Sequence, residues 1–145
     1  MEPKLISGSR IYDNRGSLRF SNDLEFKKIK RFYIVHNYDN NFIRAWHGHL
    51  KEDKYIGCIK GTFQVSAVKL DKIKKPNKKN KVYNFFLNQS DSNFVHIPKG
   101  YANGSMSLEV NSELLIFSTS SLTESLKDDF RFGAKYWNPW NVKFR

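Results

Sequence analysis

Short runs of alternating apolar and polar residues, separated by turn-forming residues, most constrain how this chain can fold. The alternation is clearest over residues 32–36 and 63–67. Because successive side chains of a β-strand point to opposite faces, this pattern predicts strands with one buried face. Further strands are expected at 55–59, 82–87, 93–97 and 113–117, with turn signals at 60–61, 77, 88–92, 98–100 and 103–104. Several short strands at near-regular spacing favour an all-β sandwich or barrel.

Helical periodicity is nearly absent from the sequence. Only residues 122–130 are expected to form a turn or two of helix, with Thr123 as the N-cap. The chain of 145 residues has no internal repeat and no linker-like segment. We therefore assign residues 1–145 to one domain, which is large enough to bury a core.

The formal net charge of +11 predicts attraction to anions without naming one. Seven lysines lie between Lys69 and Lys81, opposed only by Asp71, and this stretch is expected to be a solvated loop between two strands. A nucleic-acid-binding stripe is the alternative, but it would interleave arginines and aromatics with the lysines. A phosphate-bearing small molecule suits the positive field better, so we do not expect nucleic acid as a partner.

The location of the protein is predicted from what the sequence lacks. No apolar stretch approaches the roughly 20 residues needed to span a bilayer, and the first residues lack the apolar region of a signal peptide. Cys58 is the only cysteine, which excludes an intrachain disulfide and fits a reducing compartment. We therefore expect a cytoplasmic protein that does not associate with membranes.

The run Arg-Ala-Trp-His-Gly-His at residues 44–49 is the first candidate for chemistry. On a regular strand, Arg44 and Trp46 would share one face, and His47 and His49 would share the other. Two imidazoles on a concave inner face can bind a metal ion, or one of them can act as a base near neutral pH. Buried histidines with a purely structural role are the plainer alternative.

Two segments resemble the two halves of the cupin motif: His47-Gly-His49, and the run Pro-Lys-Gly-Tyr-Ala-Asn at 98–103. This resemblance implies a jelly-roll barrel, a double-stranded β-helix. Metal-binding cupins carry a histidine where Asn103 stands, and a neutral amide is a poor ligand for transition metals. Glu52 follows His49 by three residues and is expected to turn to the wrong face of a continuous strand. We therefore expect no metal and no cofactor, with a metal-dependent cupin as an alternative.

Cations near the histidine pair favour catalysis over a structural role. Arg44, Lys54 and Arg15 carry charges that no core requires. The planar guanidinium of an arginine suits phosphate oxygens. A base flanked by phosphate clamps predicts proton abstraction from a nucleotide-activated substrate.

Several sequence elements follow one another in an order typical of one family. They are Asp13-x-Arg15-Gly16, Arg44-x-x-His47, Lys54, Ile97-Pro-Lys-Gly-Tyr-Ala-Asn-Gly104 and Tyr136-Trp-Asn-Pro-Trp140. Over nearly its whole length the chain thus resembles the dTDP-4-dehydrorhamnose 3,5-epimerases, metal-free cupins, usually dimers, that act on nucleotide-linked 4-keto-6-deoxy sugars. The front half is also similar to the dTDP-4-keto-6-deoxyhexose 3,4-ketoisomerases, through Lys30-Arg31-x-Tyr33 and Arg44-x-x-His47-x-His49.

The resemblance implies roles for the matching residues. His47 matches the base that removes a proton next to the ketone in both families. Lys54 matches a lysine near the sugar ketone, where a cation would stabilise enolate charge. Arg44 matches the diphosphate-binding arginine of the epimerases, and Arg15 resembles their nucleotide-contacting arginine.

Further site residues follow from the ketoisomerases and from the second half of the motif. The ketoisomerases keep Tyr33 and His49 in the active site. We place Asn103 and Tyr101 among the substrate-binding residues, and rank Tyr33 before Tyr101 as the acid that returns a proton. Three tryptophans are expected to pack in the core or in a dimer interface, with a stacking wall for the nucleotide base as the alternative: Trp46, Trp137 and Trp140.

Two departures from the epimerases leave the outcome of the reaction open. Where they carry an acid tyrosine, residues 118–121 read Ser-Thr-Ser-Ser, and the nearest candidate to orient the base histidine is Asp128 or Asp129. We predict an isomerase of deoxysugar and polysaccharide biosynthesis, a homodimer acting at C3 and/or C5 of a dTDP-linked sugar as an epimerase. The alternatives are a 3,4-ketoisomerase and a non-catalytic sugar-nucleotide-binding cupin.

Overall fold

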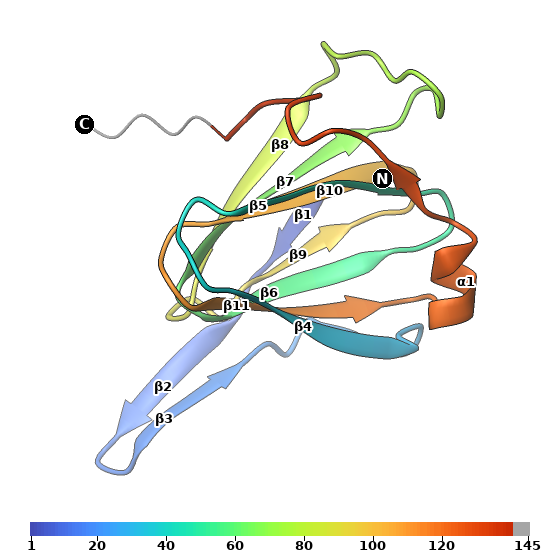
Figure 1. Ribbon diagram of the computed structural model, residues 1–145. Coiled ribbons are helices and arrows are strands. Elements are labelled where there is room, and N and C mark those ends of the chain that lie inside the picture. The colour runs from blue at the N-terminus through green and yellow to red at the C-terminus, as the bar shows by residue number, and fades with distance from the viewer. Residues whose placement is uncertain (141–145) are drawn as a thin grey trace.

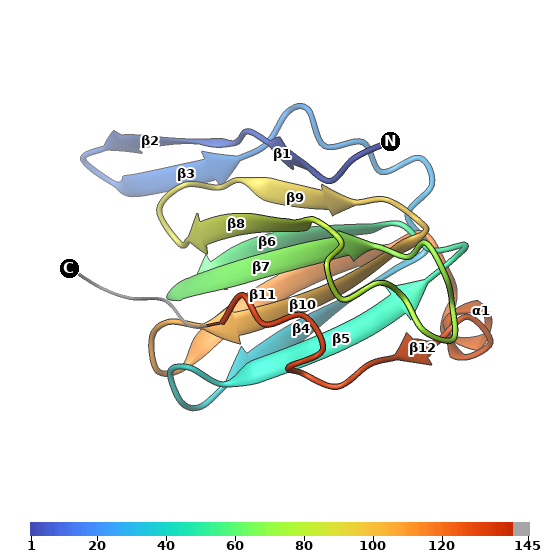
Figure 2. The same cartoon turned by 90° about the horizontal axis from the view of Figure 1, so that it is seen from above.

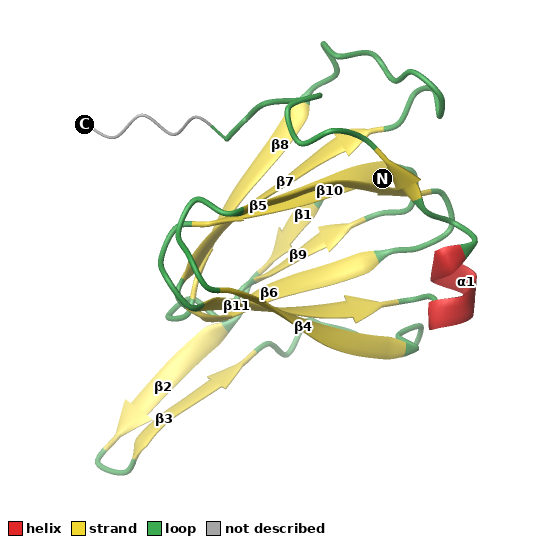
Figure 3. Ribbon diagram, in the orientation of Figure 1, coloured by secondary structure: helices red, strands yellow, loops and turns green. Residues whose placement is uncertain are grey.

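The computed structural model describes residues 1–140, in which two five-stranded antiparallel sheets face each other (Figures 1 and 3). The strand orders are β1-β9-β6-β11-β4 and β12-β5-β10-β7-β8. The strands of these sheets are β1 (Lys4–Ile6), β4 (Arg31–Asn37), β5 (Ile43–His49), β6 (Lys54–Lys60), β7 (Thr62–Lys69), β8 (Val82–Asn88), β9 (Phe94–Ile97), β10 (Tyr101–Ser107), β11 (Ser112–Ser118) and β12 (Phe130–Arg131). The predicted all-β jelly-roll fold is confirmed.

The main core lies between the two sheets. On β7, Phe63, Val65 and Ala67 are fully buried and face this core, as the alternation predicts. Gln64 lies on the outer face of the same strand, where its amide nitrogen donates to the carbonyl of Pro139 at 3.1 Å. The outer face is therefore also covered, by the C-terminal segment.

That segment, residues 132–140, forms a second core against the outer face of the second sheet. Trp46 of β5 is fully buried there, with ring centroids 5.4 Å from Trp137 and 5.3 Å from Trp140. The Trp46 indole nitrogen also donates to the carbonyl of Trp137 at 3.0 Å. The tryptophans therefore pack in a core. The alternative of a stacking wall for the nucleotide base is wrong, because they are buried against one another.

A hairpin of β2 (Ser9–Asp13) and β3 (Gly16–Phe20) projects from the sandwich (Figure 1). Its apolar side chains Ile11, Tyr12 and Leu18 are exposed. The sequence does not predict these strands, because their apolar residues do not form a clear alternating run.

Two local predictions are wrong. The Asn-Gly pair at 103–104 is not a turn but lies inside β10. Helix α1 (Leu122–Leu126) has Ser121 rather than Thr123 as its N-cap. The Ser121 hydroxyl accepts from the Glu124 amide, and the Glu124 carboxylate accepts from the Ser121 amide. This capping box fixes the start of the helix.

The lysine-rich stretch connects β7 to β8 as a loop, as predicted. The Asp71 carboxylate organises it by accepting from the Asn77 amide and the Asn80 side chain. Within residues 1–140, no helix has the length and apolar character needed to cross a bilayer.

Candidate active site

A cavity of about 300 Å³ opens between the two sheets, near the end of β5 and the start of β6. Helix α1 contributes to its wall and lies beside β12 at one end of the sandwich (Figure 2). Most of the site residues predicted from the sequence line this cavity: Tyr33, Arg44, His47, His49, Lys54 and Asn103.

A β-bulge determines which side chains of β5 reach the cavity. Residues 45 and 46 of β5 together face the single residue Gly104 of β10. This extra residue breaks the alternation, so Arg44 lines the cavity with His47 while Trp46 enters the outer core. The prediction that Arg44 and Trp46 share a face is therefore wrong.

His47 is half-buried in the cavity wall. Burial and the charges of Lys54 and Arg131 lower the pKa of His47 from 6.5 to about 4. The imidazole is therefore neutral at pH 7 and can accept a proton. The Asn103 side chain donates to the His47 carbonyl at 3.3 Å, which ties β10 to β5 at this point.

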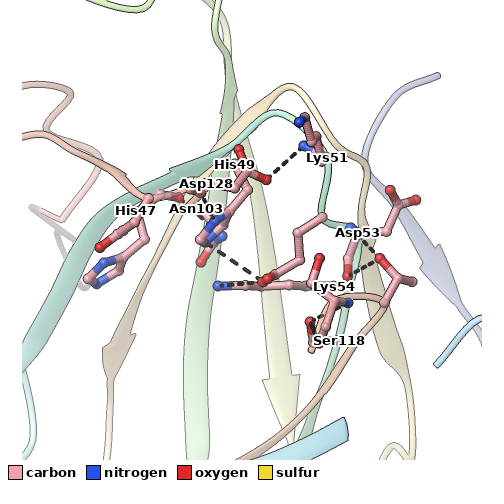
Figure 4. A network of polar contacts seen from close by, with 12 residues as sticks. His47, His49, Lys51, Asp53, Lys54, Asn103, Ser118 and Asp128 are labelled. Atoms are coloured by element: carbon pink, nitrogen blue, oxygen red, sulfur yellow. Dashed lines mark hydrogen bonds and ion pairs between the residues drawn. The ribbon is translucent and has the colours of Figure 1, made fainter. Parts of the chain in front are cut away.

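His49 is buried and is oriented by Asp128 (Figure 4). Its Nδ1 donates to the Asp128 carbonyl at 2.5 Å, while the Asp128 carboxylate accepts from the Leu50 and Lys51 amides at 2.8 Å each. Because a carbonyl can only accept, Nδ1 carries the hydrogen and Nε2 carries the lone pair of the neutral ring. Burial and the charge of Lys54 lower the pKa of His49. Asp128 thus orients the second histidine of the pair.

Lys54 is buried at the start of β6, and its Nζ lies 3.7 Å from Oε2 of Glu52. Figure 4 shows the Lys54 side chain extending toward His49. Glu52 is fully buried, and the expectation that it turns away from the site is wrong. That expectation assumed a continuous strand, whereas β5 ends at His49 and the following loop turns Glu52 inward.

Tyr33 reaches the cavity from β4, which belongs to the sheet opposite β5. The guanidinium carbon of Arg31 lies 5.0 Å from the Tyr33 ring centroid. A phenolic hydroxyl can donate or accept a proton. Tyr33 is therefore a proton-transfer candidate on the other side of the cavity from the histidines.

Two predicted site residues do not line this cavity. Arg15 lies at the tip of the β2–β3 hairpin and pairs with Asp13 at 2.6 Å. Tyr101 is buried in the main core, with its ring centroid 6.1 Å from that of Tyr83, and burial raises the pKa of Tyr101. In this chain by itself, neither side chain contributes to the cavity wall.

Helix α1 and the following segment supply cavity residues that were not predicted as site residues from the sequence. Leu122 and Leu126 line the cavity while remaining largely exposed. Arg131 lies at the same wall, where its Nε donates to the Asp129 carboxylate at 3.0 Å. The capping box could have located the helix, but no local pattern indicates that it folds against the histidine strand.

Residues 1–135 match the family model described as FdtA: WxcM-like, C-terminal. The chain belongs to this family. No match is found among curated protein sequences.

Solved structures similar to this FdtA-family chain include members of both groups suggested by the sequence. The dTDP-4-dehydrorhamnose 3,5-epimerase of Bacillus anthracis, crystallised with TDP and PPi, has a TM-score of 0.77 and 18% identity over 98% of this chain and 86% of that chain. QdtA, a sugar 3,4-ketoisomerase of Thermoanaerobacterium thermosaccharolyticum in complex with TDP, has a TM-score of 0.71 and 22% identity over 93% and 91%. A 3,4-ketoisomerase of Helicobacter canadensis has a TM-score of 0.70 and 20% identity over 98% and 99%. At these identities, the likeness establishes the shared fold.

The cavity of this FdtA-family member combines groups suited to moving protons. It holds two imidazoles of lowered pKa, a buried ammonium and a tyrosine hydroxyl. Among the described residues, no three His, Cys, Asp or Glu side chains are grouped to hold a metal ion. The groups present can accept a proton, return a proton and stabilise a negatively charged oxygen.

Proposed function

We propose that this protein is an isomerase of a dTDP-linked 4-keto-6-deoxyhexose in deoxysugar biosynthesis, and that its reaction begins with loss of the proton next to the ketone. The proposal depends on one observation: His47, His49 and Lys54 line a single cavity. Membership of the FdtA family and the names of the structures with the same fold support a nucleotide sugar as the substrate.

In the first step, His47 removes the proton from the carbon next to the ketone. Such a proton is only weakly acidic, so the reaction needs a positioned base and a stabilised enolate. The lowered pKa of His47 keeps the ring neutral and ready to accept this proton. The Lys54 ammonium faces the ketone oxygen, where a donor aimed at developing negative charge contributes about 3–4 kcal/mol.

For the second step, we propose that the ketone migrates from C4 to C3. The C3–H bond breaks to give an enediolate, a proton is added to C4, and the O3 hydroxyl proton moves to O4. Substrate and product are isomers, so no external oxidant or reductant is consumed. Two histidines two residues apart on β5 support this outcome, because both line the same cavity. They would approach one face of a bound sugar, where His49 would serve the second transfer.

Epimerisation at C3 or C5 is the second candidate, and the position of Tyr33 favours it. Inversion requires that a proton leave from one face of the ring and return to the other. Tyr33 projects from the sheet opposite His47, so its hydroxyl would supply the acid for which residues 118–121 provide no tyrosine.

We also propose that the protein is a homodimer in which the β2–β3 hairpin contacts a second copy. An isolated two-stranded hairpin is marginally stable in water, and this one exposes Ile11 and Leu18. Phe32 and Ile34 of β4 are also exposed, on the outer face of the first sheet. In such a dimer, Arg15 would reach a nucleotide bound to the partner subunit, while Arg44 would bind the diphosphate in its own cavity.

Identification of the product by NMR tests the proposed reaction. The protein is incubated with dTDP-4-keto-6-deoxyglucose, and we expect a 3-keto isomer. A product with an inverted centre at C3 or C5 and the ketone still at C4 would show that the reaction is epimerisation and not ketone migration. Binding of dTDP without turnover of any 4-keto sugar would contradict both and favour a non-catalytic binding module.

A further inference from the structure

Glu52 is a buried charge that the proposed reaction does not use. Its side chain has no exposed surface, and neither carboxylate oxygen receives a hydrogen bond from a described residue. Removing a carboxylate from water is costly unless it is compensated by nearby charge. The groups around Glu52 must therefore compensate for the unfavourable free energy of burying its carboxylate.

Two basic groups of the candidate site flank the same carboxylate oxygen. Oε2 of Glu52 lies 3.7 Å from Nζ of Lys54 and 3.8 Å from Nε2 of His49. Both neighbours are themselves buried. Glu52 is thus shared between a permanent cation and an imidazole that can become one.

The loop that carries Glu52 is fixed at both of its ends. The Asp128 carboxylate accepts from the Leu50 and Lys51 amides, and the Asp53 amide donates to the Thr119 hydroxyl at 2.9 Å. These bonds hold the backbone on either side of Glu52, so its position does not depend on contacts of the carboxylate itself. Such anchoring of the backbone is typical of a side chain that is held in place for function.

The tautomer of His49 makes the contact with Glu52 depend on protonation. Nδ1 donates to the Asp128 carbonyl, so the neutral ring carries its lone pair on Nε2, the nitrogen that lies 3.8 Å from Oε2 of Glu52. A lone pair facing a carboxylate is unfavourable, whereas a proton on Nε2 converts the contact into an attraction between opposite charges. In addition, Nε2 is buried without a hydrogen-bond partner among the described residues.

We propose that Glu52 is a positioning residue that stabilises the proton on Nε2 of His49 during turnover, and that Lys54 is its counter-ion in the resting enzyme. This inference rests on the proposed function, because it assigns a part to His49 in the proton transfers. When His49 accepts a proton from the substrate, Glu52 becomes the partner of two cations. When His49 releases the proton, Glu52 returns to Lys54 alone.

The charged groups around His49 determine the direction of each test. Three of them act on it, from the loop, from β6 and from the α1–β12 connection: Glu52, Lys54 and Asp128. His47 on β5 also acts on it when its ring is protonated. The Glu52 charge favours protonated His49, and the Lys54 charge opposes it. Removing one or the other should therefore shift the titration of His49 in opposite directions.

NMR titration of the histidine rings in the free protein tests this arrangement without any substrate. In Glu52→Gln, the His49 midpoint should fall by about 1 pH unit, and in Lys54→Gln it should rise by a similar amount. His36, which contacts Asn111 rather than this network, serves as the internal reference. Asp53→Asn is the matched control: it removes the neighbouring carboxylate, which pairs with His96 at 2.8 Å, and should leave the His49 midpoint unchanged.

An unchanged His49 midpoint in Glu52→Gln, or shifts of the same sign in both variants, would overturn the proposal. If Glu52→Gln does not fold, the Lys54→Gln titration decides: a rise supports the arrangement, and no rise overturns it. Kinetics add a second readout, since Glu52→Gln should lower kcat about 10-fold or more with little change in KM, with partial recovery in Glu52→Asp. The titrations could shift as expected although no 4-keto sugar is converted. In that case the proposed function is wrong, and so is the role of Glu52 during turnover. The electrostatic coupling of Glu52 and Lys54 to His49 would still be established.

Discussion

At His47, burial and two nearby cations act in the same direction on the imidazole. Burial, Lys54 and Arg131 lower its pKa from 6.5 to about 4, and Asp129 opposes them. A histidine whose pKa is lowered in the folded state stays neutral as the pH falls, until the pH reaches that lower pKa. The ring is thereby a weaker base, but it is available in its basic form over a wide pH range.

The pH dependence of kcat/KM should show this directly. Because the neutral form of His47 is the active one, activity should be lost only as the pH falls through about 4. Arg131→Gln removes one of the cations that lower the pKa, so its acid limb should move to higher pH. An acid limb centred near 6.5 in the unmodified protein would contradict the assignment of His47 as a buried base.

Asp128 should matter for both stability and activity. In Asp128→Ala the Leu50 and Lys51 amides lose a charged acceptor, so the free energy of unfolding should fall by about 1–3 kcal/mol. The kcat should fall as well, because the loop following His49 is no longer held in place. Denaturant unfolding measures the first effect and steady-state kinetics the second.

Asp129→Ala is the control for this prediction. Its carboxylate forms a largely exposed pair with Arg131, so the free energy of unfolding should change by less than about 1 kcal/mol. Equal losses of stability in Asp128→Ala and Asp129→Ala would contradict the anchoring role of Asp128.

At the scale of the secondary-structure elements, the bulge between β5 and β10 determines what the cavity contains. It brings Arg44 to the same wall as His47 and turns Trp46 outward. The bulge depends on Gly104, where an added Cβ would lie 2.6 Å from Cβ of Ala45 and 3.0 Å from a ring carbon of Trp140. Such close approach requires a residue without a side chain.

Gly104→Ala should therefore destabilise the protein and disturb the cavity. We expect a loss of about 1–3 kcal/mol in the free energy of unfolding, typical of overpacking, together with reduced activity. In the matched control Gly133→Ala, an added Cβ meets nothing within 4 Å, and stability should be nearly unchanged. Equal stability of the two variants in denaturant titrations would show that β5 tolerates a different arrangement.

The sequence predicts an element well where alternation and turn residues agree, as in β4 and β7. Prediction failed at β10, because all residues from 101 to 107 are buried and the strand therefore shows no alternation. The cavity residues could be chosen by type, since proton transfer and phosphate binding need His, Lys and Arg. The shared face of His47 and His49 was predicted correctly. The faces of Arg44 and Glu52 could not be predicted, because the bulge opposite Gly104 and the inward turn of Glu52 arise from pairing with segments distant in sequence.

At the scale of the whole molecule, the polar cavity lies in a different part of the sandwich from the exposed apolar side chains of the β2–β3 hairpin and of β4. The cavity lies between the sheets beside α1, whereas the apolar side chains are exposed on the projecting hairpin and on the outer face of β4. Contact with water is unfavourable for such apolar surfaces. A second copy of the chain that covers them would leave the cavity open to substrate.

The proposed dimer predicts that Leu18→Glu shifts the protein toward monomers. The substitution introduces a charge onto the apolar hairpin, and burial of that charge in an interface is unfavourable. Val110→Glu is the control, because Val110 is similarly exposed, at 60% against 59% for Leu18, but belongs to the turn between β10 and β11 and not to the hairpin. Light scattering measures the mass of each. A monomeric unmodified protein, or equal masses for both variants, would contradict the proposed interface.

Exchange of a single carbon-bound proton in D₂O tests the central claim most directly. The protein is incubated with dTDP-4-keto-6-deoxyglucose, and deuterium incorporation next to the ketone is followed by NMR. With the unmodified protein we predict incorporation at C4 of the 3-keto product, and at C3 of the substrate re-formed by the reverse reaction. The rate should be about 10²- to 10⁴-fold lower with His47→Asn, whose binding of dTDP should remain unchanged. Exchange at the same rate in both proteins, or none at any carbon in the unmodified protein, would contradict the account.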